Sequence, residues 1–84
     1  MIEEYKDIYI TIGENLKAFR KYRNLTQEQL AQKIDKLDRS KISDIENAKE
    51  DFMFSKILQI CTALEIEVTQ LLKPIKKKEP NSNI

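Results

Sequence analysis

The chain has 84 residues, of which 40% are hydrophobic and 35% are charged, and its formal net charge is only +1. This length and composition predict one small folded domain. With no histidine and a single cysteine, the chain lacks the usual residues for a zinc site or a disulfide framework, so we expect no metal and no cofactor. No glycine-rich phosphate loop and no nucleophile motif is present, so we expect no enzymatic activity.

No apolar stretch approaches the length of a membrane span, and nothing resembles a signal peptide. We therefore expect a cytoplasmic protein without a membrane partner. Glycine occurs once and proline twice, which is too few turn residues for an all-β fold. The composition favours an all-α fold with short connections.

The first ten residues form an ambiguous lead-in. The segment "DIYITI" alternates like a strand, yet Tyr5, Ile8, Tyr9 and Ile12 are also spaced like one face of a helix. We expect residues 1–10 to be helical or irregular. A first helix is then predicted over about 11–23, with Ile12, Leu16, Phe19 and Tyr22 on its buried face.

Two short helices are predicted next. Thr26 followed by Gln29 is a capping-box pattern, and Leu25 with Leu30 can form a hydrophobic staple, so a helix should run from here to about Asp35. Asp38 is a good N-cap for a following helix that ends near Asn47 or Ala48. Ile42 and Ile45 are the inward residues of this second helix.

A fourth helix is predicted over 53–64, where apolar residues recur at helical spacing and Cys61 is expected in the core. The stretch "DFMF" before it is either core or a protruding dimer contact. A short fifth helix is expected over 68–73, and Pro74 should end it. We divide the chain into a lead-in (1–10), a domain (11–73) and a basic, disordered tail (74–84).

The helices that begin at Thr26 and Asp38 are too short to be stable alone in water. They therefore need a shared core with the first and fourth helices. Such a core would rigidly present the outer face of the segment that begins at Arg39. Rigid presentation is useful when that face must enter a partner of fixed shape, and the major groove of DNA admits an α-helix.

At this point the residues resemble a known family. The stretches "IGENLK", "LTQEQLA", "ISDIEN" and "ALEIEVTQLL" are each similar to the phage-repressor/Cro-type (Xre) helix-turn-helix family, and together they cover about residues 12–72. The resemblance implies a compact five-helix, lambda-repressor-like domain. In such a domain the second helix crosses the DNA backbone and the third lies in the major groove.

The resemblance also implies roles for individual residues. Arg39, Ser40 and Asp44 occupy positions that usually face base edges. The positions expected to contact phosphate or to lie at the helix end are Gln27, Lys41, Ser43, Asn47 and Lys49. Arg20 and Glu46 match a structural salt bridge between the first and third helices.

The sequence departs from the family pattern at several turns. Leu30 and Ile42 are one position further apart than usual, and Asp35 and Lys36 stand where a single glycine is typical. We expect the extra residue to relax the need for a left-handed glycine there. Ala48 and Glu65 stand at two other positions where the family usually has glycine, after the third and the fourth helix.

The charge distribution agrees with a DNA-binding role. Residues 17–49 contain nine basic and five acidic residues, a net charge of +4, whereas the rest of the chain carries −3. We therefore expect a sequence-specific regulator of double-stranded DNA, a repressor or autoregulator that binds a palindromic operator as a homodimer. The dimer surface is expected at the fifth helix, helped by "DFMF" or the lead-in. The alternative is a protein-interaction module, such as an antitoxin whose main partner is a toxin.

Overall fold

The computed structural model describes residues 3–74, and all the regular secondary structure in this part of the chain is helical. A 3-10 helix at Glu3–Tyr5 leads directly into the first of five α-helices. The five are α1 (Lys6–Tyr22), α2 (Gln27–Gln32), α3 (Arg39–Glu46), α4 (Phe54–Leu64) and α5 (Val68–Leu72). The predicted all-α, five-helix class is confirmed.

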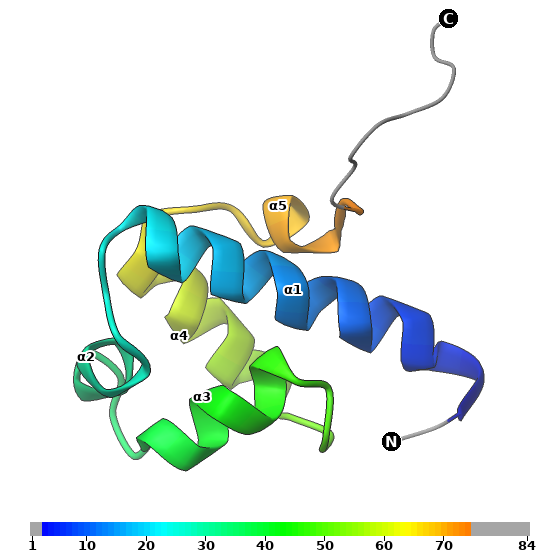
Figure 1. Ribbon diagram of the computed structural model, residues 1–84, viewed down its shortest axis with the longest axis horizontal. Coiled ribbons are helices and arrows are strands. Elements are labelled where there is room, and N and C mark those ends of the chain that lie inside the picture. Colours follow the sequence, from blue (N-terminus) through cyan, green and yellow to red (C-terminus); the bar gives the residue numbers. More distant parts are fainter. Residues whose placement is uncertain (1–2, 75–84) are drawn as a thin grey trace, which may run out of the picture.

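The longest helix, α1, is the central element of the fold. It packs against α5 on one side and α3 on the other, and α2 packs against α3 (Figure 1). The core lies between these helices and α4. Its buried apolar residues are Ile12, Leu16, Leu30, Ala31, Ile34, Ile42, Ile45, Ile57, Ile60, Cys61, Leu64 and Leu71. Each of the five α-helices contributes to this core, so the short helices α2 and α3 are held by packing.

The start signals of α2 and α3 are found where the sequence places them. Thr26 Oγ1 accepts a hydrogen bond from the backbone N–H of Gln29, and the Gln29 side chain accepts one from the N–H of Thr26. Asp38 Oδ1 accepts from the N–H of Lys41 at 3.0 Å. These caps satisfy backbone donors that a short helix otherwise leaves unpaired.

Two expectations for α1 are wrong. The helix begins at Lys6 rather than near residue 11, because the helical spacing of the lead-in prevails over its strand-like alternation. Tyr22 does not share the buried face, since its side chain is 75% exposed. Tyr22 is the last residue of α1, and the guanidinium of Arg23 lies 5.6 Å from the centre of its ring.

The turns correct a further expectation. Lys36 has a φ of 59°, so the longer turn between α2 and α3 still contains a left-handed residue. Ala48 (φ 53°) and Glu65 (φ 61°) adopt the same conformation after α3 and α4. The extra residue therefore does not remove the need for a left-handed position, and Lys36 occupies it in place of glycine.

The predicted lead-in and tail are only partly within the described range. Residues 1–2 and 75–84 lie outside it, so the expectation of a disordered tail concerns residues that the structure does not describe, apart from Pro74. Among residues 3–74, no helix is both long enough and apolar enough to cross a membrane.

Candidate nucleic-acid interface

The helix α3 separates its residues into a buried and an outer face. Ile42, Ile45 and Glu46 are buried, with exposed fractions of 6% or less. The outer face consists of small polar and charged side chains. Of these, Arg39, Ser40, Lys41 and Asn47 are exposed, whereas Ser43 and Asp44 are half-buried. The outer face therefore presents donors and acceptors without contributing to the core.

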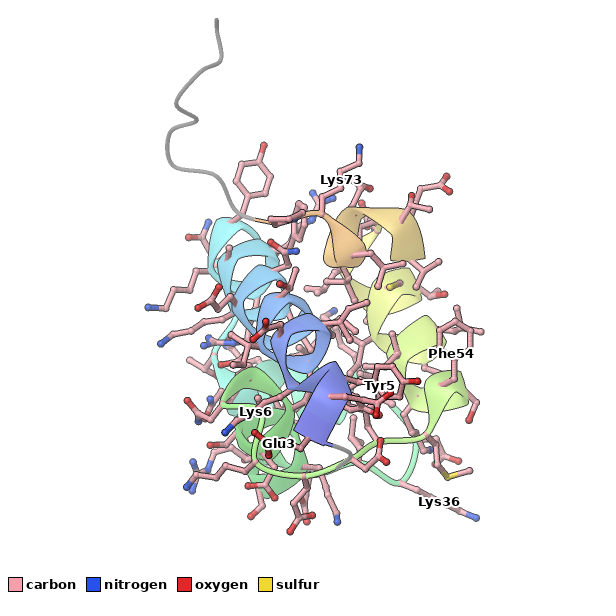
Figure 2. All side chains as sticks on the ribbon, turned by 90° about the vertical axis from the view of Figure 1, so that its right-hand side faces the viewer. Glu3, Tyr5, Lys6, Lys36, Phe54 and Lys73 are labelled. Atoms are coloured by element: carbon pink, nitrogen blue, oxygen red, sulfur yellow. The ribbon has the colours of Figure 1, made fainter. Side chains whose placement is uncertain are left out.

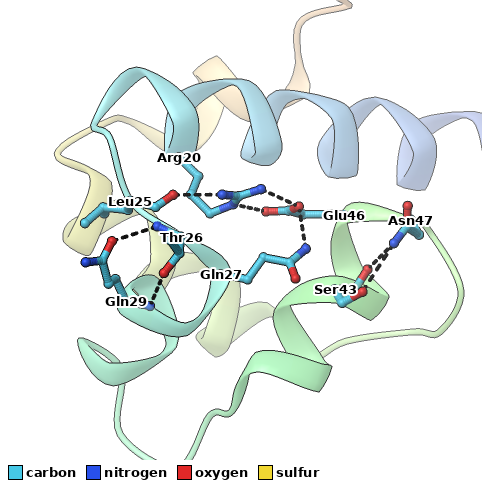
Figure 3. A network of polar contacts seen from close by, with 8 residues as sticks. All are labelled: Arg20, Leu25, Thr26, Gln27, Gln29, Ser43, Glu46 and Asn47. Atoms are coloured by element: carbon cyan, nitrogen blue, oxygen red, sulfur yellow. Dashed lines mark hydrogen bonds and ion pairs between the residues drawn. The ribbon is translucent and has the colours of Figure 1, made fainter.

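A buried polar network holds α3 against α1 and α2 (Figure 3). Arg20 Nε donates to Glu46 Oε2 at 2.6 Å, and Arg20 Nη2 donates to Glu46 Oε1 at 3.1 Å. Arg20 Nη1 also donates to the carbonyl oxygen of Leu25 at 2.7 Å. Arg20 and Glu46, which the family resemblance pairs, thus form a bidentate ion pair. Removing one partner would leave a buried charge alone, at a cost of about 3–5 kcal/mol.

Gln27 belongs to the same network. Its Nε2 donates to Glu46 Oε1 at 3.0 Å, and its side chain is half-buried at the start of α2 (Figure 3). One amide hydrogen and the amide oxygen remain available. The network therefore orients the residue that is predicted to contact phosphate.

Two residues of the predicted interface that follow α3 form hydrogen bonds with the end of this helix. Asn47 Nδ2 donates to the carbonyl oxygen of Ser43 at 2.9 Å and lies 3.3 Å from Ser43 Oγ. The N–H of Lys49 donates to the carbonyl oxygen of Asp44 at 2.9 Å, which closes the end of the helix. Both the side chain of Lys49 and that of Arg39 are exposed.

A groove of about 430 Å³ runs along one flank of α3. Leu37, Ile45, Phe52 and Met53 supply its apolar lining, and Lys41 and Asp44 line it from α3. At the other wall, Lys56 Nζ donates to the carbonyl oxygen of Asp35 at 2.9 Å. This bond ties the longer turn before α3 to α4 and so limits its movement.

Two residues that position α1 against its neighbours, Gly13 and Asn15, were not identified from the sequence. Gly13 lies in α1 where a Cβ atom would be 2.5 Å from the carbonyl oxygen of Ile45 and 2.6 Å from that of Glu46. Asn15 is 5% exposed, and its Nδ2 donates to the carbonyl oxygens of Leu71 (2.7 Å) and Lys73 (2.5 Å). The only signal for Gly13 is that the chain's sole glycine interrupts a helical pattern.

The N-terminal part of α1 contacts the loop after α3. Tyr9 Oη donates to Asp51 Oδ1 at 2.5 Å, and the Tyr9 and Phe52 rings lie 4.9 Å apart. The hydrogen bond to Asp51 raises the pKa of Tyr9, and the same bond lowers the pKa of Asp51. Elsewhere, burial raises the pKa of the Cys61 thiol, consistent with a packing role for this residue.

Comparisons with known proteins agree with this architecture. The helix-turn-helix domain family matches residues 13–75. The immunity repressor protein of Bacillus phage phi105 is 40% identical over 63 residues, which cover 75% of this chain and 43% of the repressor. The control protein C.MunI of Mycoplasma sp is 38% identical over 73 residues, or 86% of this chain and 97% of that protein.

A solved structure is also similar. The restriction-modification controller protein C.AhdI from Aeromonas hydrophila superposes with a TM-score of 0.73 at 31% identity, over 80% of this chain and 96% of that one. The chain belongs to the helix-turn-helix domain family, in its Xre-type branch. It is therefore a DNA-binding transcription regulator. It spans less than half of the phage repressor that it matches.

Proposed function

We propose that the protein binds an operator of two inverted half-sites as a homodimer and represses transcription, including that of its own gene. The observation that carries this proposal is the exposed polar face of α3, which is held at a defined angle by the buried Arg20–Glu46 pair. Such a face is suited to a major groove, where side chains read donors and acceptors on base edges. A cytoplasmic location would follow from the DNA target.

We assign the base contacts to Arg39, Ser40 and Asp44. Arginine can bond guanine through two donors, and a carboxylate can accept from the amino group of cytosine. Lys41, Lys49, Gln27, Ser43 and Asn47 are assigned to the phosphates or to the ends of the contact. All of these residues are exposed or half-buried, so each of them is accessible to a duplex placed against α3.

We place the dimer surface on α4 and α5. Phe54 (61% exposed) and Leu58 (43%) lie one turn apart on α4, and Leu72 (42%) lies on α5. Met53 is 68% exposed beside them in sequence, so most of the "DFMF" stretch protrudes, while Phe52 is half-buried against the core. One domain offers little area to DNA, and a two-fold dimer doubles it.

The test is a selection of bound sequences from random DNA duplexes, with the purified protein at two salt concentrations. We expect enrichment of an inverted repeat with half-site centres about 10 base pairs apart, or a multiple of this spacing. Enrichment should persist at the higher salt, because base contacts depend less on counterion release than phosphate contacts do. Recovery of unrelated sequences at both concentrations would contradict the proposal.

The alternative role, an antitoxin-type module with a protein as its main partner, is not favoured. The relatives described above are named as a repressor and control proteins. Co-purification of a small protein that masks α3 would be the result that revives it.

A further inference from the structure

The first turns of α1 precede the region that the helix-turn-helix family model matches. The match begins at residue 13, whereas α1 begins at Lys6. In Figure 1 this part of α1 extends past the end of α3, above the connection between α3 and α4. These turns therefore lie next to the loop of residues 47–53, which we call the α3–α4 loop.

Tyr9 joins the extension to this loop by two contacts. Its hydroxyl bonds Asp51, and its ring packs on Phe52. Asp51 Oδ1 also accepts a hydrogen bond from the N–H of Phe52 at 2.9 Å. The same carboxylate oxygen therefore bonds both Tyr9 of α1 and the backbone of the loop. Tyr9 is half-buried, whereas Tyr5, one turn earlier, is 53% exposed and projects towards the side of the molecule that carries Phe54 (Figure 2).

The α3–α4 loop lies beside the outer face of α3. Its residues Glu50, Asp51, Phe52 and Met53 line the same groove as Lys41 of α3. Lys49 follows Ala48, the left-handed residue after α3, and its N–H donates a hydrogen bond to the carbonyl oxygen of Asp44. The backbone of Lys49 is therefore fixed on the helix side by α3 and on the loop side, two residues later, by Tyr9.

We propose that Tyr9 is a positioning residue for DNA binding: through Asp51 and Phe52 it holds the α3–α4 loop so that Lys49 reaches a phosphate. This role rests on the proposed phosphate contact of Lys49. Without the tether, the loop has fewer constraints, so holding Lys49 against the phosphate costs more conformational freedom, and the contact forms in only part of the complexes. The extension of α1 thus belongs to the DNA-binding apparatus rather than to the fold alone.

The test compares Tyr9→Phe, Lys49→Ala and the double variant with the unmodified protein. Binding to a short random-sequence duplex is measured by fluorescence anisotropy between about 50 and 200 mM salt. Lys49→Ala should make the slope of log K against log[salt] less steep by about 0.9, the value for one phosphate that is no longer neutralised. Tyr9→Phe, which keeps the ring but removes the hydroxyl, should produce at least half of that change. In the double variant the slope should equal that of Lys49→Ala, because both changes act on the same phosphate interaction.

Tyr5→Phe is the matched control, since it removes the same hydroxyl one turn away and should leave the slope unchanged. If Tyr9→Phe lowers the melting temperature but leaves the salt slope intact, Tyr9 is structural only and the inference is overturned. An equal change in Tyr5→Phe overturns it as well. If instead Lys49→Ala leaves the slope unchanged, Lys49 does not bind a phosphate, and the role of Tyr9 falls with it.

Discussion

At the scale of single residues, neighbouring positions in and just after α3 have different roles: some stabilise the fold, and others are available to contact DNA. Glu46 is buried in an ion pair, whereas Asn47, the next residue, is exposed. Arg39 and Lys41 are both exposed cations, yet they lie on opposite sides of Ser40 and so face different directions on the helix. Their contributions to binding should therefore be separable.

Arg39→Ala should weaken operator binding by about 1–3 kcal/mol and relax the preference at one base-pair position. Lys41→Ala should weaken binding to all sequences alike and make the salt slope less steep by about 0.9. A selection experiment combined with a salt titration measures both effects. Each variant serves as the control for the other, and the assignment fails if Arg39→Ala keeps the full sequence preference.

Gly13 is the residue where α1 and α3 approach most closely. Gly13→Ala should lower the free energy of unfolding by about 1–3 kcal/mol, because a Cβ atom would meet two backbone carbonyl oxygens that cannot move independently of α3. This destabilisation should outweigh the gain of about 1 kcal/mol that alanine brings to a helix. Urea unfolding measures the change.

Ala18→Gly is a suitable companion variant, because Ala18 is exposed on the same helix and reports helix propensity alone. If Gly13→Ala is instead more stable than the unmodified protein, the close approach of α1 and α3 is not constrained.

Contacts between residues far apart in the chain could be predicted from the sequence only in part. Arg20 and Glu46 could be paired only through the family resemblance, since nothing in their spacing of 26 residues indicates contact. Gly13 and Asn15 were missed because their importance lies in distant backbone atoms, the carbonyls of Ile45 and Leu71, which periodicity does not reveal. Tyr22 was placed in the core because a helical pattern does not show where the covering elements end.

At the scale of elements, most helix boundaries lie within two residues of their predicted positions, but α1 begins five residues early and α2 ends three residues early. The caps at Thr26 and Asp38 are local side-chain signals, and α2 and α3 begin directly after them. The ends after α3 and α4 depend on left-handed residues that are not glycine, so the usual sequence signal is missing. The early start of α1 depends in addition on contacts with a loop far along the chain.

Ala48→Gly should stabilise the fold by about 0.5–1 kcal/mol. A left-handed conformation costs a non-glycine residue about 1–2 kcal/mol, and the greater freedom of glycine in the unfolded chain offsets part of this gain. Thermal unfolding of the variant measures the difference. The same substitution at Ala63, inside α4, should be destabilising, so stabilisation at both sites would contradict the backbone explanation.

At the scale of the whole molecule, α1 connects the two surfaces on which regulation is proposed to depend. Through Gly13 and Arg20 it contacts the end of α3, and through Asn15 it holds the carbonyl groups at the end of α5. The proposed dimer surface and the DNA-reading face therefore have a common rigid support. Their relative placement should set the spacing of the half-sites that a dimer can bind.

Leu72→Glu should weaken the dimer about tenfold or more, which corresponds to ~1.4 kcal/mol or more, because a charge would be buried on the proposed α4–α5 surface. Sedimentation over a range of concentrations measures the dissociation. Operator affinity should fall as the dimer weakens, whereas the salt slope for binding to a single half-site should equal that of the unmodified protein. Tyr22→Glu, at an exposed position on α1, is the control, and an equal effect there would contradict the assignment of the surface.

The separation of faces on α3 has a consequence for changing what this protein recognises. Ile42, Ile45 and Glu46 carry the packing, so the outward positions from Arg39 to Asn47 can be exchanged for those of a related regulator with little disturbance beneath them. A graft of this kind should yield a protein with a nearly unchanged melting temperature that binds a different DNA sequence.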